Sequence, residues 1–369
     1  RSAGRLRTGT VSLTDSYLPF LGGKAFQEIQ DSVQAVPHNL IYSFMNEYQV
    51  SLIIPVYNVE NYIRESLLSA LGQTFGSIEY ILVDDCGTDR SMEIACSIVD
   101  GHPRKQDVRI VRHDRNRGLS AARNTGMTAA TGRYVFFMDS DDELTPDCIE
   151  RHYMVIIQSS ADFTIANIKL IGSKSIHIKD ISDDCISDDL LSSFLKKKWS
   201  VNAWNKLYLK NFLTSHALSF QEGLIFEDIL WSYNLCLHTD KVAWIKERTY
   251  LYKIRKNSIT ASRNNSQKIE SLLSILNKLA DDWAQGIISR KYTKEFAYMI
   301  DFSRLNTALL LLHYSGNRKE AANYYRQLCV GRLATLPVSS RQAIVLKLPF
   351  VLFCVLMRPL YYLYRILNK

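Results

Sequence analysis

Residues 50–58 read VSLIIPVYN, a short and almost wholly apolar run that ends in turn-forming residues. Such a run is typical of a strand that is buried on both faces of a sheet. Apolar residues at helical spacing follow over Ile63–Leu71, and the succession of strand and helix then repeats. Further strands are predicted at IEYILVDD (78–85), VRIVRHD (108–114) and RYVFFMDSDD (133–142), with helices over Met92–Val99 and Ser120–Ala130. This alternation predicts an α/β fold with a parallel, doubly wound sheet.

The pattern continues less regularly towards the C-terminus. Thr145-Pro146 has the residue types of an N-cap and a first helical position, before a helix over Cys148–Gln158. The remaining predictions are strands at ADFTIANIKLIG (161–172), SIHIKD (175–180) and Val242–Arg255, and helices over Leu190–Lys198, Ala203–His216 and Ile225–His238. Beyond the polar stretch 257–265 the periodicity is helical. We therefore expect an N-terminal extension over 1–44, an α/β domain over 45–260 and a mainly helical region over 261–369.

The first 44 residues have no clear link to this pattern. They contain no initiator methionine, and Met45 stands five residues before the first strong strand. One interpretation makes Met45 the natural start and residues 1–44 an upstream or artificial extension. The alternative is a native helix around Ala25–Val33. The basic opening RSAGRLRTGT has no apolar segment of the signal-peptide type.

The composition is that of a folded, basic protein. Of the 369 residues 47% are hydrophobic and 22% are charged, which excludes a disordered chain. The net charge of +8 suggests an anionic partner but does not choose among nucleic acid, nucleotide phosphates and anionic lipid, and the protein can also be basic without such a partner. The seven cysteines form no C-x-x-C pair and no cluster with zinc-binding spacing, which favours a reducing compartment.

The most apolar segment is the last one, residues 343–367, AIVLKLPFVLFCVLMRPLYYLYRIL. Lys347, Pro349, Arg358 and Pro359 interrupt it, so it has no clean run of about 20 apolar residues for a membrane-spanning helix. Aromatic residues next to Arg and Lys suit a segment that lies in the membrane interface. The alternative is a helical layer packed on the protein.

Polar residues stand at the carboxyl ends of the predicted strands, where ligands of doubly wound sheets bind. After the first two strands these are Pro55-Val56-Tyr57-Asn58 and Asp84-Asp85. An aromatic ring at a strand end can stack on a nucleobase, and a carboxylate beside it can accept a hydrogen bond from base or ribose. Aspartate is also a common helix cap in such loops, so this pair alone is a weak signal.

A second group, Asp139-Ser140-Asp141-Asp142, ends the strongly hydrophobic strand RYVFFM. Clustered carboxylates repel one another at a partly desolvated strand end unless a cation neutralises them. Hard oxygen ligands suit Mg²⁺ or Mn²⁺, which would bridge to a diphosphate and act as a Lewis acid. The alternative is an acidic loop that caps the following helix.

Two further motifs lie at predicted helix starts. Residues 118–124, GLSAARN, indicate a glycine turn, a Ser cap at Ser120 and Arg123 in the first helical turn, which is a suitable anion site. Phe226-Glu227-Asp228 opens a later helix, where one carboxylate could act as a general base towards an acceptor hydroxyl. A surface arginine and an ordinary acidic first turn are the respective alternatives.

Together the motifs resemble the family 2 glycosyltransferases with the GT-A fold. PVYNVENYIRESLLSALGQTF (55–75), YILVDDCGTDRS (80–91), NRGLSAARNTGM (116–127), YVFFMDSDD (134–142) and FED (226–228) occur in the family's order and spacing. The resemblance is strong over 50–142 and looser to about residue 260. NAWNKLY (202–208) and YLYKIRKNSIT (250–260) also look like bacterial members. No single motif is specific, but their joint occurrence is.

The resemblance implies a role for each matched position. Tyr57 would pack on the base and Asp85, beside Asp84, would bind base or ribose, while Arg123 would hold the donor site together near the diphosphate. The full donor-binding set is Pro55, Tyr57, Asn58, Asp84, Asp85, Arg123, Asp139 and Ser140. Asp139 and Asp141 match the outer positions of the family's D-x-D metal motif, with Asp141 the more direct ligand. Asp228 matches the catalytic base, with Glu227 as its neighbour, and the family inverts anomeric configuration without a protein nucleophile.

Departures from the family pattern refine the expected activity. The Q-x-x-R-W motif and the spanning helices of processive members are not found in the sequence, which predicts one sugar added per encounter. Cys86-Gly87 stands where Gly-Ser is commoner, with the glycine one position later.

UDP is the nucleotide that the resemblance favours, with GDP and dTDP as alternatives. We expect a glycan or polyprenyl-linked acceptor and a cytoplasmic enzyme, peripheral on the inner face of the membrane.

Three other functions compete with this interpretation. A nucleotidyltransferase would show a Gly-rich, basic phosphate loop after the first strand, and PVYNVENY is not one. The positive net charge alone suggests a nucleic-acid-binding role, but the sequence contains no recognisable nucleic-acid-binding module. A catalytically inactive GT-A-like module that binds nucleotide sugars is the third, and the intact Asp139, Asp141 and Asp228 argue against it.

Overall fold

The computed structural model describes residues 48–172, 180–181, 185, 189–254, 265–314, 316–330, 332–338 and 342–367. The predictions for the N-terminal extension, including the helix at Ala25–Val33 and the start at Met45, lie outside these residues. So does nearly all of the strand predicted at 175–180. The polar stretch where we expect a domain boundary is also mostly outside, so the division at residue 260 stays a prediction.

The first half of the sheet is parallel, as the alternating pattern predicts. Its strands are β1 (Val50–Val56), β2 (Ile78–Asp84), β3 (Val108–Arg112) and β4 (Tyr134–Phe137), in the spatial order β3-β2-β1-β4. Every residue of β1 is buried, in agreement with its almost wholly apolar sequence. Because the strands are parallel, β1, β2 and β4 bring their polar carboxyl ends to one edge of the sheet.

The second half of the sheet is mixed, and here the prediction of a parallel sheet is wrong. The full order of the eight strands is β3-β2-β1-β4-β7-β6-β8-β5. Its further strands are β5 (Glu143–Leu144), β6 (Phe163–Ile171), β7 (Leu207–Leu209) and β8 (Val242–Lys253). Strand β7 runs antiparallel to β4 and β6, and β5 runs antiparallel to β8, whereas β6 and β8 are parallel.

Strand β7 lies inside the predicted helix at 203–216, which is the main local error. Residues 207–209 read LYL, and three apolar residues fit a helix or a buried strand equally well. The structure uses them to pair with β4, and only Lys210–Ser215 forms a helix, α9. The N-cap predicted at Thr145-Pro146 is also shifted, because the cap residue of α6 (Cys148–Ser159) is Asp147.

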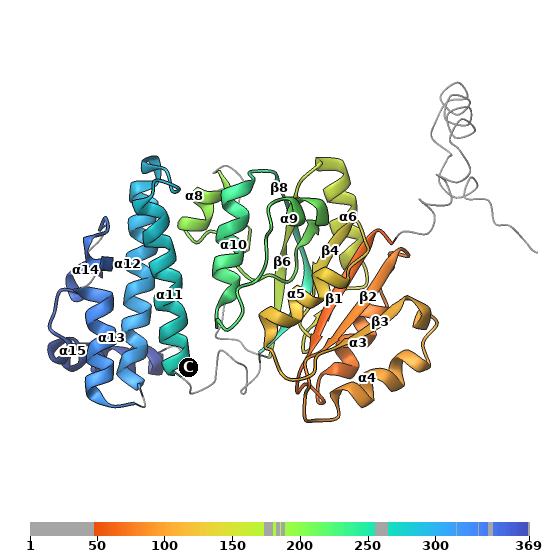
Figure 1. The fold of residues 1–369 in the computed structure, drawn as a ribbon, viewed down its shortest axis with the longest axis horizontal. Helices are drawn as coiled ribbons and strands as arrows, with labels where there is room; N and C mark the ends of the chain where they lie inside the picture. Colours follow the sequence, from red (N-terminus) through yellow and green to blue (C-terminus); the bar gives the residue numbers. More distant parts are fainter. Residues whose placement is uncertain are drawn as a thin grey trace, which may run out of the picture. The chain divides into compact units, whose positions relative to one another are not determined.

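Helices cover both faces of the sheet because successive strand residues point to opposite sides (Figure 1). Leu52 and Phe136 belong to one buried cluster with residues of α3 (Ile63–Leu71), α4 (Ser91–Asp100) and α6. Ile53 and Phe137 belong to a second cluster, on the other face, with residues of α5 (Leu119–Ala129), α8 (Leu190–Leu195) and α10 (Glu227–His238). The starts of α5 and α10 carry the motifs that were singled out in the sequence.

The C-terminal region is helical, as predicted. It comprises α11 (Asn265–Ala284), α12 (Thr293–Leu310), α13 (Arg318–Cys329), α14 (Gln342–Val345) and α15 (Phe350–Leu367). Helices α11 and α12 lie side by side (Figure 1), and α12 also packs against α8 of the preceding region. Within the described residues, no helix has both the length and the apolar character to cross a membrane.

Candidate active site at the carboxyl edge of the sheet

A cavity of about 220 Å³ lies at the carboxyl ends of β1, β2 and β4. It is lined by Pro55, Tyr57, Val59, Asp85, Asn116, Gly118, Leu119, Ala122, Asp139, Ser140 and Asp141. Six of the predicted donor-binding or metal-binding residues are among these, from three strand ends that are far apart in sequence. Tyr57 is an exposed residue (44%) on the wall of this cavity, where a ligand can reach it.

Asp85 is buried and binds the turn that precedes α5. Its Oδ1 accepts a hydrogen bond from the backbone N–H of Arg117 (2.8 Å), and its Oδ2 accepts one from Gly118 N–H (2.9 Å). His113 Nδ1 lies 2.7 Å from Asp85 Oδ1, and the other ring nitrogen of His113 lies 2.8 Å from the Thr125 hydroxyl. Asp85 therefore shapes the cavity wall. Sequence reasoning missed His113, although it also stands at a strand end.

Asn58 and Asp84 do not line the cavity but brace the turns beside it. Asn58 Oδ1 accepts from the Thr88 N–H (2.8 Å), and Asn58 itself has a φ of 51°. Asp84 Oδ1 accepts from the Cys86 N–H (3.1 Å). Cys86 has a φ of 57°, the left-handed region that glycine adopts more easily. The direct donor contact predicted for Asn58 and Asp84 stays a prediction.

Three carboxylates converge after β4. One oxygen each of Asp139, Asp141 and Asp142 lies within 4.8 Å of the others. Asp142 is fully buried, and its two oxygens accept from the Tyr250 hydroxyl (3.0 Å) and the Lys253 N–H (2.8 Å). Burial, with the charges of Asp141 and Asp139, raises the pKa of Asp142 well above its usual range. Hard oxygen ligands with excess negative charge fit a divalent cation such as Mg²⁺ or Mn²⁺.

Arg123 joins this cluster to the start of α10. Its side chain is 1% exposed, and it donates to Asp139 (2.9 Å), Glu227 (2.7 Å) and Asp228 (3.0 Å). Burial alone would lower the pKa of Arg123, but the three carboxylates outweigh burial and raise it. Arg123 is thus a permanently charged link between the predicted metal ligands and the predicted base. The sequence motif predicts an anion site at Arg123. In the structure the anions at this site are three carboxylates of the protein itself.

Glu227 and Asp228 open α10 directly after Phe226, whose φ of 69° turns the chain into the helix. Burial is the largest effect on both carboxyl groups and raises their pKa values, while the Arg123 charge opposes it. Asp228 keeps 21% of its side chain exposed, against 10% for Glu227. Of the two carboxylates, Asp228 is therefore the one more open to an incoming molecule.

The start of α5 differs from the prediction in one detail. The cap residue is Gly118, whose φ of 86° requires glycine-like freedom, and not Ser120. Ser120 lies inside the first turn, and its buried hydroxyl has no hydrogen-bond partner among the described residues. Gly118 and Leu119 still bring the N-terminal end of α5 to the cavity wall.

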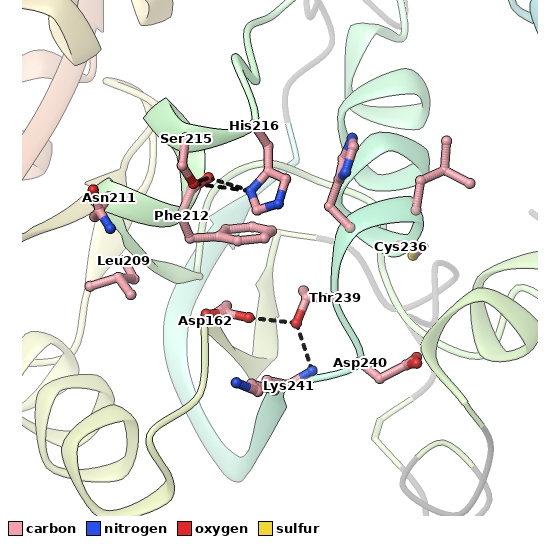
Figure 2. A pocket seen from close by; sticks show the side chains of 12 residues that line it. Asp162, Leu209, Asn211, Phe212, Ser215, His216, Cys236, Thr239, Asp240 and Lys241 are labelled. Carbon is pink, nitrogen blue, oxygen red and sulfur yellow. Dashed lines mark hydrogen bonds between the residues drawn. The ribbon is translucent and has the colours of Figure 1, made fainter.

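A second cavity, of about 680 Å³, lies at the opposite edge of the sheet, where β6 and β8 begin (Figure 2). Asp162 accepts from the Thr239 hydroxyl there, and the rings of His216 and His238 lie 4.7 Å apart. None of the predicted site residues lines it. Of these two cavities, the one at the carboxyl edge is therefore the candidate active site.

Comparisons with known proteins identify the family of the chain. The family model described as "Glycosyl transferase family 2" matches residues 51–221. "Putative glycosyltransferase EpsH" of Bacillus subtilis is 31% identical over 285 residues, which cover 73% of this chain and 79% of that protein. "Glycosyltransferase GlyA" of Streptococcus pneumoniae is 30% identical over 81% of this chain, and the chain spans only 43% of GlyA.

The fold also has solved counterparts. Residues 1–349 of TarS from S. aureus, crystallised in complex with UDP-GlcNAc, superpose with a TM-score of 0.55 at 16% sequence identity. The match covers 81% of this chain and 90% of that one. It supports the predicted GT-A architecture with a helical C-terminal region. From its motifs, its fold and its relatives, the chain belongs to glycosyl transferase family 2, a family of glycosyltransferase enzymes.

Proposed function

We propose that the protein transfers one sugar per encounter from a nucleotide-diphosphate sugar to a hydroxyl of a glycan or lipid-linked acceptor, with inversion of the anomeric centre. UDP is the nucleotide that we favour, because the similar TarS fragment was crystallised with UDP-GlcNAc. The acceptor assignment follows a relative from Escherichia coli that is 30% identical over 132 residues, "UDP-Glc:alpha-D-GlcNAc-diphosphoundecaprenol beta-1,3-glucosyltransferase WfgD". We place the reaction in polysaccharide biosynthesis.

The observation that carries the proposal is the buried contact of Arg123 with both Asp139 and Asp228. This contact links a predicted metal ligand to the predicted base, beside the cavity that Tyr57 and Asp85 line. In this arrangement the donor's base would stack on Tyr57 at one end of the cavity. Its diphosphate would lie towards Asp139 and Asp141 at the other.

In this proposal one set of residues acts on the leaving group and another acts on the attacking hydroxyl. Asp139 and Asp141, with Asp142 behind them, would hold a divalent cation, which supplies Lewis-acid neutralisation of the departing diphosphate. Asp228 would accept the proton of the acceptor hydroxyl as that oxygen attacks the sugar. Arg123 pairs with Asp139 and Asp228, and its charge opposes the rise that burial causes in the pKa of Asp228. A single displacement of this kind inverts the anomeric centre and needs no covalent sugar–enzyme bond.

We expect donor hydrolysis that depends on a divalent metal. The test is a panel of UDP-, GDP- and dTDP-sugars assayed with Mn²⁺, with Mg²⁺ and with EDTA. One donor should be hydrolysed with metal and lose at least about 100-fold of the rate in EDTA, because the charge on the leaving group is then unopposed. Asp141→Asn should respond to EDTA much less than the parent enzyme. If folded protein binds no nucleotide sugar at all, the proposal is wrong, and binding without turnover would favour the inactive module.

We also propose that the protein works at the surface of a membrane, on its cytoplasmic face, through α15. Large apolar side chains at helical spacing are exposed on this helix: Val351, Leu352, Val355, Leu356 and Leu360. Arg358, which is exposed on the same helix, and the net charge of +8 suit anionic headgroups. A helix that lies in the interface would hold the enzyme near a lipid-linked acceptor.

Removing the apolar stripe should remove membrane binding. We expect the wild-type chain to co-sediment with vesicles that contain phosphatidylglycerol, and Val355→Glu/Leu356→Glu to stay in solution, because two carboxylates oppose insertion into the interface. Val338→Glu is the matched control, since Val338 is an exposed valine outside α15. Equal sedimentation of the double variant and the wild type would contradict this proposal and leave the transferase proposal intact.

A further inference from the structure

Two motifs that the proposed function leaves without a role meet behind the acidic turn, Asp139-Ser140-Asp141-Asp142. NAWNKLY (202–208) supplies Trp204, and the motif that begins at residue 250 supplies Tyr250. The two rings stack, with their centres 4.2 Å apart and their planes 17° from parallel. Both side chains are buried. Packing therefore fixes the Tyr250 ring, and the hydroxyl is the polar group that this stack presents to its surroundings.

The Tyr250 hydroxyl bridges the two ends of the acidic turn. It accepts a hydrogen bond from the Asp139 N–H (3.1 Å) and donates one to Asp142 Oδ2 (3.0 Å). The Asp142 N–H also donates to the Asp139 carbonyl (3.2 Å), which closes the turn. Leu144, which follows shortly after the turn, pairs with Tyr250 in the antiparallel ladder of β5 and β8. Contacts of Tyr250 at both ends of the turn therefore set its position relative to β8.

The three carboxyl groups of the acidic turn have different surroundings. Both oxygens of Asp142 accept hydrogen bonds from β8, one from the Tyr250 hydroxyl and the other from the Lys253 N–H (2.8 Å). Asp142 is fully buried and does not line the cavity at the carboxyl edge, whereas Asp139 and Asp141 do. Asp142 is therefore placed to anchor the turn to β8, and Asp139 and Asp141 are placed to meet a ligand.

We propose that Tyr250 is a positioning residue for the divalent cation: through its two hydrogen bonds, the hydroxyl holds the acidic turn in the shape that brings the Asp139 and Asp141 carboxylates together. The proposal rests on the proposed role of these two carboxylates as metal ligands. Groups that orient the ligands of a metal typically contribute about 10- to 100-fold to its affinity. A hydroxyl that served only the stability of the fold would have no such effect on metal affinity.

The test compares Tyr250→Phe with Tyr208→Phe in the full chain. Tyr250→Phe keeps the ring that stacks on Trp204 and removes only the hydroxyl. Its Kd for Mn²⁺, followed by the electron paramagnetic resonance signal of the free ion without nucleotide and with UDP, should rise about 10- to 100-fold. Tyr208 is likewise fully buried, and its hydroxyl donates to the Ala203 carbonyl (2.8 Å) and accepts from Trp231 Nε1 (3.1 Å), so neither bond involves the acidic turn. Tyr208→Phe should bind Mn²⁺ as the wild type does.

The outcomes separate this proposal from the proposed function. Equal Mn²⁺ affinity in the wild type and Tyr250→Phe would overturn the role of Tyr250 and leave Asp139 and Asp141 as the proposed metal ligands. An equal loss of affinity in Tyr208→Phe would also overturn it, because any missing buried hydroxyl would then loosen the site. A folded wild type that binds no Mn²⁺ under either condition would overturn the proposed metal site itself. If Tyr250→Phe does not fold, Trp204→Phe keeps the hydroxyl but reduces the stack that holds it, and should weaken Mn²⁺ binding in the same direction.

Discussion

Replacing Asp228 by asparagine should abolish sugar transfer while the donor still binds. Asparagine keeps the shape of the side chain and can still accept from the Arg123 guanidinium, but it cannot take a proton from the acceptor hydroxyl. We expect kcat to fall by about 10²- to 10⁴-fold, the usual contribution of a general base. Donor affinity, measured by calorimetry with metal present, should change little, because Asp228 is not among the residues that line the donor cavity.

The pH dependence of the wild-type enzyme gives an independent check on the same residue. Burial raises the pKa of Asp228 above its ordinary value of 3.8. A base must be ionised to act, so kcat should decline as the pH falls through this raised pKa, at a higher pH than for an exposed aspartate. Asp240→Asn, at the opposite edge of the sheet, is the matched control and should behave like the wild type. Transfer retained in Asp228→Asn would assign the base to another group.

The sequence predicts the parallel half of the sheet well because its signal is local. Strands β1, β2 and β4 are short apolar runs between turn residues, and polar residues follow each of them. Both features can be recognised from neighbouring residues in the sequence alone. Parallel pairing then brings Tyr57, Asp85 and Asp139 to one edge as a geometrical consequence. The gathering of the candidate site could therefore be predicted before any contact was known.

What escaped prediction depends on partners that are distant in the chain. Strand β7 is only three residues long and is defined by its pairing with β4 and β6, so no local period reveals it. In the sequence Asp142 is only one more residue of an acidic loop, whereas in the structure the Tyr250 hydroxyl of β8 donates to it. Lys206 belongs to the motif at 202–208, but its burial against the Ser200 and Asn202 carbonyls is a property of the loop conformation. Such roles arise from packing and not from spacing.

Removing the charge of Arg123 should have the largest effect on stability. Arg123→Met leaves Asp139, Glu227 and Asp228 close together without their shared cation, at a position where Arg123 itself is 1% exposed. Breaking a buried ion pair on one side costs about 3–5 kcal/mol in the free energy of unfolding, because the remaining charge stays buried and unpaired. We expect a loss of that size in urea denaturation at pH 7.5, together with loss of transfer.

Two comparisons make the Arg123 prediction specific. Arg123→Lys keeps the charge, but a single ammonium cannot replace a planar guanidinium that donates to three carboxylates, so it should recover only part of the stability. Arg90→Met breaks an exposed pair with Glu93 and should leave the free energy of unfolding almost unchanged, because water screens this pair.

The pH dependence of the free energy of unfolding identifies why Arg123→Met is less stable than the wild type. Burial already raises the pKa values of Glu227 and Asp228, and without the arginine charge that opposes this rise they are higher still in the folded protein, so the folded state of Arg123→Met binds more protons than the unfolded chain. Its stability should therefore rise relative to the wild type as the pH falls from 7.5 towards 5, since protonation removes the repulsion. A deficit that is constant over this range would mean that Arg123 contributes by packing, for example against Phe220, whose ring centre lies 5.2 Å away. In that case the charge of Arg123 would not stabilise the three carboxylates. The proposed electrostatic link between the metal ligands and the base would then be wrong.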